Sequence, residues 1–290
     1  MTPPDEEALA QSFEDLRPHL LRVAYSTTGS LAEAEDCVQE SWLRLRRVAV
    51  EEIRDLRAWL TTTVGRLALD SLRSARVQRE AYVGPWLPEP VVDEMGGGDP
   101  AERIVFEDAI NMALLVVLER LSPAERTAFL LHDVFGLGFE EVARVVDRTP
   151  AATRQLAARA RRHVEAGQPR FPPTRGEQQE LVGAFAAACE HGDLDRLLVL
   201  LDPEVAWHGD GGGKVASVPL MRGAANVADR LLAFTRVPPR SIRLVDVNGA
   251  PGIVMHDAYG GLNVLSFTID GGRIVALDIV RNPDKLHGVT

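Results

Sequence analysis

The chain has 290 residues, 46% of them hydrophobic, and its 42 acidic and 32 basic side chains give a formal net charge of −10. A chain this long and this apolar is neither disordered nor one small domain, and about two domains with separate cores are expected. The negative total argues against a general polyanion binder, although it is compatible with basic patches on one face.

The two cysteines, Cys37 and Cys189, lie far apart and form no CxxC or Cys/His pattern. This usage predicts reduced thiols in a cytoplasmic protein with no disulfide framework, no metal site and no cofactor. The first ten residues are acidic where a secretory signal would be basic, and no run of 18 apolar residues occurs, so neither secretion nor a membrane span is expected.

Residues 12–80 have the apolar periodicity of helices throughout. Ser30 followed by Glu33 predicts a capping box at the start of the second helix. Prolines and three consecutive glycines then predict a linker over 81–107. Within this linker, Trp86 and Leu87 are too apolar for a mere spacer.

A second helical block is predicted over 108–166, with helix already present from 101 to 120. Ser122 and Pro123 together are a start signal for a further helix. A short helix over 139–146, a tight turn and a longer helix from Thr149 to about Val164 predict a helix-turn-helix.

After a linker at 167–175, residues 176–290 change character. One amphipathic helix around Phe185 precedes segments of alternating apolar residues, and Gly271-Gly272 after Asp270 is a hairpin signal. The alternating positions are Ile242, Leu244 and Val247; Ile253 and Met255; Leu262, Val264, Phe267 and Ile269; Ile274, Leu277 and Ile279. The predicted fold class is therefore multidomain, with two all-α domains followed by an α+β domain of about 115 residues.

An acidic helix face is the first candidate site. Asp36, Glu40 and Leu43 share one side of their predicted helix, and this side could dock a basic helix of a partner. The alternative is a solvated flank on which Glu40 and Arg44 pair at i,i+4. Taken alone, the pattern favours the solvated flank.

A basic helix over 56–79 is the second candidate. Its polar side carries an aromatic ring and three threonines beside arginines, a combination that suits unstacked bases. The alternative is a surface helix with a buried tryptophan, which is commoner. The predicted contact residues are Arg57, Trp59, Arg66, Arg73 and Arg76, with Arg79 on the same side.

The second helix of the helix-turn-helix is the third candidate, since it has no acidic residue from Thr149 to Val164. Recognition helices read base edges with their first turn and phosphates with flanking arginines. A purely structural basic helix is the weaker alternative, because spacing and charge agree. The predicted contact residues are Thr149, Ala151, Thr153, Arg154, Gln155, Arg159, Arg161 and Arg162.

The segments AEDCVQESWLRL (34–45) and DLRAWLTTTVGRLALDSLRS (55–74) resemble region 2 of sigma-70 family factors of the extracytoplasmic-function type, and residues 121–164 resemble region 4. The resemblance implies a transcription initiation factor, monomeric when free, that needs core RNA polymerase and promoter DNA and catalyses nothing itself. It implies that the helix from Arg57 reads and melts the −10 element and that Thr149–Arg162 reads the −35 element. The family's polymerase-clamp contact falls on Asp36, Gln39, Glu40 and Leu43.

The C-terminal part resembles the SnoaL-like (nuclear-transport-factor-2-like) cone, which a subgroup of these factors carries as a fused regulatory domain. The marks of that subgroup are WLPEP in the linker, DGGGK and NPDKL, and we expect DGGGK to be an exposed loop that contacts WLPEP, with NPDKL adding a second contact. The implied regulatory residues are Trp86, Leu87, Pro88, Asp210, Gly211, Gly212, Gly213, Lys214, Asn282, Pro283, Asp284, Lys285 and Leu286.

A function of another class stays open for this domain, because SnoaL-like cones include isomerases and hydrolases that act on apolar rings. In that alternative Trp207, His208, Asp210, His256 and Tyr259 would line the cavity, with Asp210 or His208 as the base. No carboxylate pair or His/Asp spacing identifies a reaction, so binding without catalysis is favoured and no catalytic residue is assigned. The sequence does not decide whether the cavity holds a small ligand or is simply a core.

Overall fold

The computed structural model describes residues 3–289 apart from 50–52, 81, 83, 96–109, 236 and 238. Its internal contacts divide the chain into a helical unit, Met1–Glu80 with Val117–Ala166, and a sheet unit, Ala81–Val116 with Gly167–Thr290. Among the described residues, no helix is long and apolar enough to cross a membrane.

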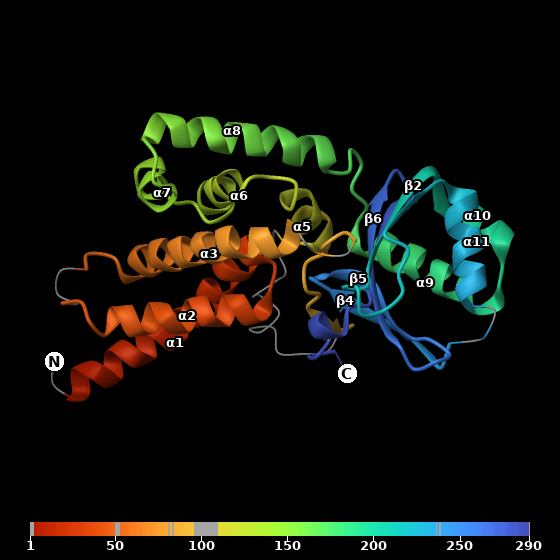
Figure 1. The fold of residues 1–290 in the computed structure, drawn as a ribbon, viewed down its shortest axis with the longest axis horizontal. Coiled ribbons are helices and arrows are strands. Elements are labelled where there is room, and N and C mark those ends of the chain that lie inside the picture. The colour runs from red at the N-terminus through yellow and green to blue at the C-terminus, as the bar shows by residue number, and fades with distance from the viewer. Residues whose placement is uncertain are drawn as a thin grey trace. The chain divides into compact units, whose positions relative to one another are not determined.

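Three long helices begin the helical unit: α1 (Pro3–Thr28), α2 (Leu31–Leu45) and α3 (Leu56–Glu80), which pack side by side (Figure 1). Helicity over 12–80 is therefore interrupted at 46–49 and 53–55, where the expectation of helix throughout is wrong. The second part contains the end of α5 (Met112–Leu118), then α6 (Pro123–Phe129), the π-helical turn η2 (Leu130–Val134), α7 (Phe139–Val146) and α8 (Pro150–Gly167). The predicted helix over 101–111 lies mostly outside the described residues.

The two predicted helix starts have different outcomes. Ser122 and Glu125 form a full capping box around Pro123, because each side chain accepts a hydrogen bond from the other's backbone N–H. Ser30 occupies the N-cap position of α2, but its side chain makes no capping hydrogen bond. Glu33 instead accepts from the Ser71 hydroxyl at 3.0 Å, so the predicted capping box there is wrong.

Helix α3 is buried on two sides. Leu60 and Val64 are fully buried with the apolar residues of α1 and α2. Gly65 faces Leu131, and a Cβ there would lie 2.9 Å from the Leu131 Cδ1 atom. The helices that follow residue 117 therefore pack closely on α3 and complete one core with α1 and α2.

A buried cation joins the two parts of the helical unit. The Arg126 side chain is 1% exposed and donates to the Ser26 carbonyl at 3.1 and 2.9 Å and to Glu119. Arg79 donates to Glu119 at 3.1 Å and to the Thr28 carbonyl at 2.5 Å. These guanidinium groups satisfy carbonyls at the end of α1, where a helix has no partners of its own.

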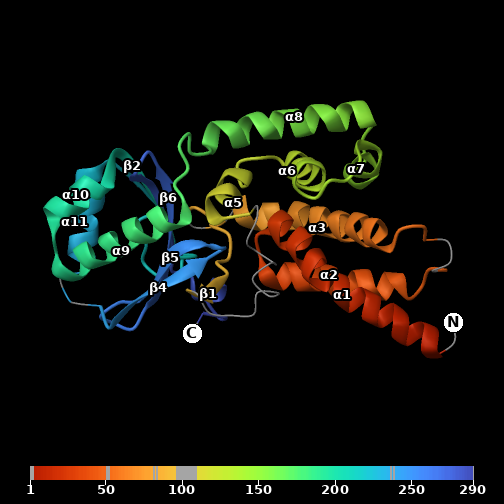
Figure 2. The same ribbon diagram turned by 180° about the vertical axis from the view of Figure 1, so that it is seen from behind.

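In the described residues of the sheet unit, seven strands form one sheet and three main helices accompany it. Figures 1 and 2 show this arrangement from opposite sides. The sheet order is β1-β4-β5-β6-β7-β2-β3, and all neighbours are antiparallel except β2 and β7. The helices are α9 (Arg175–His191), α10 (Leu194–Leu200) and α11 (Ala224–Thr235). The strands are β1 (Val92–Glu94), β2 (Leu201–Asp210), β3 (Leu220–Arg222), β4 (Ser241–Val247), β5 (Ala250–His256), β6 (Leu262–Asp270) and β7 (Arg273–Val280).

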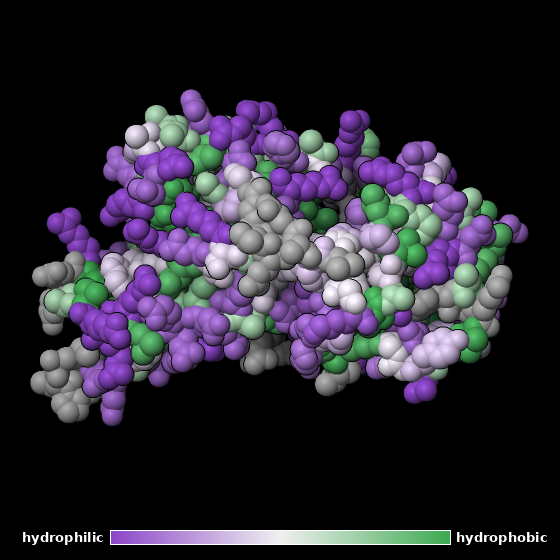
Figure 3. Space-filling view, viewed as in Figure 1, coloured by the Kyte–Doolittle hydropathy of each residue, from purple (hydrophilic) through white to green (hydrophobic). Residues whose placement is uncertain are grey.

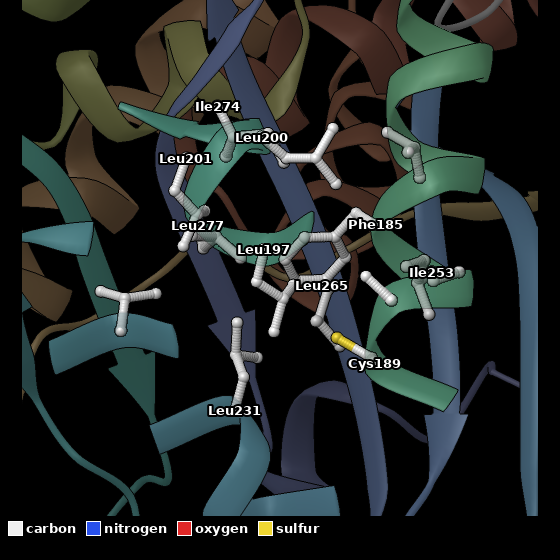
Figure 4. Close-up of a cluster of buried hydrophobic side chains, with 14 of the residues drawn as sticks. Phe185, Cys189, Leu197, Leu200, Leu201, Leu231, Ile253, Leu265, Ile274 and Leu277 are labelled. Atoms are coloured by element: carbon white, nitrogen blue, oxygen red, sulfur yellow. The ribbon is translucent and has the colours of Figure 1, made fainter. Parts of the chain in front are cut away.

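The helices cover one face of this sheet and form the main core with it (Figure 4). Phe185 and Cys189 of α9 lie against residues such as Leu265 and Leu277 of the strands. Helices on one face of a largely antiparallel sheet are the architecture expected for the SnoaL-like cone. The predicted hairpin turn is confirmed, because Gly271 and Gly272 connect β6 to β7 with φ of 55° and 75°.

The other face of the sheet carries a second core that includes the supposed linker. Leu87 and Met112 pack there with Val245, Val264 and the terminal Leu286. Residues 92–94 add strand β1 to the edge of β4. Leu87 and Val92 of the expected linker pack on the sheet, in keeping with the expectation that Leu87 is too apolar for a mere spacer. Met112 and Val116, in the block expected to begin the second helical domain at 108, pack on the same face.

Candidate functional site

The acidic face of α2 is present on the helical unit. Asp36 and Gln39 are exposed, Glu40 is half-buried and Leu43 is 39% exposed, so all four predicted residues are on the accessible side of the helix. Glu40 also accepts from Arg44 at 3.0 Å, which is the i,i+4 pair of the alternative interpretation. Because that pair is exposed, its contribution to stability is small.

A groove of ≈ 320 Å³ adjoins this face, between α1 and α2. Its walls include Phe13, Val38 and Trp42, and the rings of Phe13 and Trp42 are 4.9 Å apart. Gln39 lines the groove as well, together with the charged Glu14, Arg17 and Glu35, so the polar face and the groove are continuous.

The structure separates the predicted residues of α3. The half-buried Trp59 shares one side of the helix with the exposed Arg66 and Arg73 at helical spacing. Arg57 is also exposed but lies across the helix, where its guanidinium is 3.4 Å from His19 Nδ1. The position of the Arg76 side chain lies outside the described residues. Arg79 is wrongly placed on this surface by the sequence, since its side chain is only 12% exposed and belongs to the Glu119 network.

Burial also explains His19, which the sequence did not single out. Its Nε2 lies 3.1 Å from the Thr61 hydroxyl, which is itself buried under the ring. Burial and the neighbouring guanidinium groups of Arg57 and Arg22 lower the pKa of His19 to about 4. Thr61, the first of the three consecutive threonines of α3, is therefore a structural residue rather than a contact for bases.

The helix-turn-helix consists of α7 and α8. The connection turns at Asp147, whose φ of 55° ends α7. The Thr149 hydroxyl then accepts from the Ala152 N–H at 3.2 Å, as N-cap residues do. In Figure 3 the surface over α8 is predominantly hydrophilic.

The residues predicted to read DNA on α8 fall into three groups: exposed residues, one buried threonine, and two arginines that are paired with carboxylates. Ala151, Arg154 and Gln155 are exposed beside Thr149 in the first turns, and Arg162 is exposed near the end. Thr153 is fully buried and its hydroxyl donates to the Thr149 carbonyl, so its inclusion as a DNA contact is wrong.

Two arginines of α8 bind carboxylates of the same unit. Arg159 donates to Glu125 at 2.7 Å, and Arg161 donates to Asp133 at 3.0 Å. Both guanidinium groups remain about half exposed, so phosphate contact there would replace or share an existing ion pair.

Asp210 is the centre of the contacts in the sheet unit. Its carboxylate is 0% exposed and accepts from the Tyr82 hydroxyl at 2.6 Å, the Leu87 N–H at 3.0 Å, the Gly212 N–H at 3.0 Å and the Lys285 ammonium at 2.7 Å. These donors come from the WLPEP segment and its preceding tyrosine, the glycine loop and the NPDKL strip. The predicted contact between loop and linker is therefore present, but the expectation of an exposed loop is wrong at Asp210.

The Lys285 side chain is also largely enclosed, with 10% exposed. It also donates to the Leu87 carbonyl and lies 3.9 Å from the centre of the Trp86 ring and 5.0 Å from that of Tyr82. A desolvated cation above aromatic faces is stabilised by their quadrupoles. Burial and the bond to Asp210 raise the pKa of Tyr82, so its phenol stays protonated as the donor.

The glycines of the loop permit this close packing. A Cβ at Gly211 would lie 2.1 Å from the Val215 carbonyl oxygen. At Gly212, φ is 63° and a Cβ would lie 2.5 Å from the Asn282 amide. Farther along the loop, Lys214 donates to Asp284 at 2.7 Å, in a pair that is more than half exposed.

The residues of the enzyme alternative do not share a cavity. Trp207 lines a small cavity inside the cone, but His208 and Asp210 alternate with it along β2 and point to the opposite face. His256 bonds Ser241 at 3.0 Å, and Tyr259 is 88% exposed. His208 forms a 2.7 Å pair with Asp278, outside the lining of that cavity. The alternative in which these five residues line one cavity does not agree with the structure.

Tyr82 is the residue that sequence reasoning missed. It joins Asp210 to Asn282, whose amide donates to the Tyr82 oxygen at 2.8 Å. The available signal was its place four residues before Trp86, because a linker that packs at one aromatic residue tends to be anchored at others nearby.

Two family models match this chain: Sigma-70 region 2 over residues 13–77 and Sigma-70, region 4 over residues 111–164. Both matches fall on the helices that carry the candidate surfaces of α2, α3 and α8. The fold and these matches define the class, which is the sigma-70 family of transcription factors.

Similarity over nearly the whole chain defines the group within that class. The chain is 43% identical to the ECF RNA polymerase sigma factor SigJ of Mycobacterium tuberculosis, over 95% of this chain and 92% of that protein. It is 34% identical to the probable ECF RNA polymerase sigma factor SigI of the same species, over 93% and 92%. A crystal structure of M. tuberculosis SigJ matches with a TM-score of 0.81 at 41% identity, covering 96% of this chain and 98% of that one. The chain belongs to the extracytoplasmic-function (ECF) sigma factors.

Proposed function

We propose that the protein joins core RNA polymerase in the cytoplasm, reads the −10 and −35 elements of promoters and starts transcription under the control of its own sheet unit. The observation that carries this proposal is the exposure of three separate surfaces on the helices that match sigma regions 2 and 4. The protein itself supplies recognition, and the polymerase supplies the chemistry.

The polymerase contact is assigned to Asp36, Gln39, Glu40 and Leu43. Reversing two charges, with Asp36→Arg and Glu40→Arg together, is expected to abolish capture of core polymerase at physiological salt. The same reversal at Glu140→Arg on α7, also exposed, is the matched control and is expected to leave capture unchanged. Full binding by the double variant, with an unchanged thermal melt, would return α2 to the solvated-flank interpretation.

The −35 contact is assigned to the first turns of α8. Arg154→Ala and Gln155→Ala are each expected to relax discrimination at one upstream base pair by about 1–3 kcal/mol. Arg162→Ala, at the exposed end of the helix, is expected to weaken all upstream sequences equally, as the loss of a phosphate contact does. Equal losses across all sequences for Arg154 and Gln155 would reassign them to the phosphate backbone.

The −10 contact is assigned to Trp59, Arg66 and Arg73, which share one side of α3 at helical spacing. Trp59→Ala in the holoenzyme is expected to slow promoter opening, because base stacking on an aromatic ring contributes about 1–3 kcal/mol. The effect of Trp59→Ala on promoter opening is compared with that of Arg57→Ala, because Arg57 lies on the opposite side of α3, beside His19. If Trp59→Ala reduces transcription equally on a pre-melted template and on a duplex template, Trp59 contributes to DNA binding in general rather than to melting.

Control by the sheet unit is assigned to the contacts around Asp210. The chain between regions 2 and 4 passes through Tyr82 and Leu87, so releasing these residues from Asp210 and Lys285 changes the path that connects the two DNA-reading regions. Asp210→Ala is expected to alter transcription in a reconstituted assay and to raise protease cleavage near Trp86. Asp284→Ala, which removes only the exposed pair with Lys214, is the matched control.

Point variants are the appropriate test here. Truncation after Gly167 would uncover Leu87 and Met112, which are buried on the sheet, and would confound regulation with exposed apolar surface. Equal transcription by wild type and Asp210→Ala at every promoter tested, despite increased cleavage near Trp86, would show that the contact is structural only.

A further inference from the structure

A stack of three side chains connects η2 and α7 to the first turns of α8. The His132 ring of η2 lies on the Phe139 ring of α7, with their centres 3.7 Å apart and their planes inclined by 29°. The guanidinium carbon of Arg154 lies 5.3 Å from the centre of the same Phe139 ring. Figures 1 and 2 show the first turns of α8 beside α7, so the stack belongs to the helix-turn-helix itself.

The histidine of this stack has a fixed ring. His132 Nδ1 lies 2.8 Å from the Leu137 carbonyl oxygen, and because a carbonyl only accepts, Nδ1 carries the proton and donates. The backbone around it is a π-helical turn, in which the Phe135 N–H donates to the Leu130 carbonyl at 2.9 Å. Such turns are uncommon and often occur at functional sites. The hydrogen bond and the turn together hold the His132 ring against Phe139.

The arginines of α8 are held in two different ways. Carboxylates of the same unit hold Arg159 and Arg161 by their N–H groups. Arg154 lies instead over an aromatic ring, which attracts a guanidinium through its quadrupole. A bidentate contact to a base uses the N–H edge of a guanidinium and leaves its face unused. Arg154 can therefore stay on Phe139 while its N–H groups read a base.

We propose that Phe139 is a positioning residue for Arg154 and thereby sets how sharply one base pair of the −35 element is discriminated. This role rests on the proposed function, in which Arg154 contacts the −35 element. A free arginine loses the entropy of many rotamers when it binds, and a ring that already restricts the side chain reduces this loss. The restriction favours the correct base, because a wrong base presents no matching acceptors in the direction in which the arginine is held.

Base-pair discrimination by the holoenzyme tests this role. The measured quantity is the ratio of transcription from the preferred promoter to transcription from a promoter with one upstream base pair replaced, at subsaturating holoenzyme. Arg154→Ala is expected to lower this ratio by at least about fivefold at one position. At that position Phe139→Leu is expected to lower it by about two- to fivefold, as the loss of an exposed cation–π contact does. A general loss of folded protein cancels in the ratio, so a merely structural role would not change it.

Three further variants separate positioning from stability. Phe139→Tyr retains the ring and is expected to keep the wild-type ratio. Phe135→Leu is the matched control and is also expected to keep it, because the half-buried Phe135 ring lies 5.7 Å from that of His19 and belongs to another contact. With Arg154→Ala already present, Phe139→Leu is expected to cause no further loss, since residues that act through one contact are not additive.

The outcomes distinguish this role from the contact on which it rests. If Arg154→Ala lowers the ratio but Phe139→Leu does not, or if the two losses multiply in the double variant, the positioning role is wrong although the −35 contact stands. If Arg154→Ala leaves the ratio unchanged at every upstream position, the −35 contact is wrong and the positioning role fails with it. An equally lowered ratio for Phe135→Leu would assign the effect to the stability of the helix-turn-helix and would also overturn the proposal.

Discussion

The helical unit and the sheet unit each bury an ion pair that joins distant parts of the chain, but with opposite charges at the centre. In the helical unit the centre is a cation, Arg126, which satisfies carbonyls at the end of α1 and shares Glu119 with Arg79. In the sheet unit the centre is an anion, Asp210, whose four donors come from three separate segments.

This difference determines how each unit responds to change. Glu119 is 18% exposed and retains a second guanidinium if one is removed, so the cationic network has a substitute and some access to water. Asp210 is completely enclosed, and its carboxylate forms the ion pair with the Lys285 ammonium. A buried ion left alone is strongly destabilising, whereas a pair that reaches solvent is not. The sheet unit is therefore the more sensitive of the two.

The largest effect is expected for Asp210→Ala. It leaves the Lys285 ammonium without its carboxylate and removes the acceptor for Tyr82 and Leu87, at a cost of about 3–5 kcal/mol in the free energy of unfolding. Urea unfolding followed by Trp86 and Trp207 fluorescence, with the other two tryptophans changed to Phe, measures it. A loss below 1 kcal/mol would show that the charges are not buried in solution.

Arg126→Met is expected to destabilise the helical unit by about 3 kcal/mol, at the lower end of the range for a broken buried pair, because Arg79 still binds Glu119. Amide hydrogen exchange is expected to increase at the end of α1, where the Ser26 carbonyl loses its donors. Arg120→Met is the exposed control. Comparable destabilisation by Arg126→Met and Arg120→Met would show that the buried ion pair of Arg126 contributes no more to stability than an exposed arginine does.

The pair of Lys214 and Asp284 provides the small-effect counterpart to Asp210. Both side chains are more than half exposed, and Lys214→Ala is expected to change the free energy of unfolding by less than about 1 kcal/mol. The effect is expected to diminish further in 1 M salt, since exposed pairs are screened. A large, salt-independent loss would mean that the whole loop depends on Lys214.

A pH-dependent contribution between pH 7.5 and pH 5 is expected from His19 of the helical unit. Its folded pKa of about 4 is below the value of about 6.5 in an unfolded chain, so the unfolded state binds the proton more readily. The contribution is complete above pH 6.5 and is lost as the pH falls toward 4. The difference in unfolding free energy between pH 7.5 and pH 5 is expected to be smaller for His19→Gln than for the wild type. Equal differences would assign the pH dependence to carboxylates.

The sequence by itself determined the helices of both sigma regions, the helix-turn-helix and the strands after residue 240, because each has a local period or a local start signal. Ser122-Pro123 and Gly271-Gly272 are such signals, and both are confirmed. It also indicated the acidic face of α2 and the exposed first turns of α8, since helical spacing alone places those residues.

Only the tertiary structure decided which polar residues are accessible and which segments share a core. Thr153 and Arg79 have the residue types of DNA contacts, but Thr153 is buried and Arg79 is only 12% exposed. Asp210 ends β2 beside a glycine loop and is fully enclosed. The segment around Leu87 has the composition of a linker, and its burial depends on the opposite face of a sheet built more than a hundred residues later. Burial and the pairing of distant charges depend on long-range packing, for which no local pattern of residues is a sufficient signal.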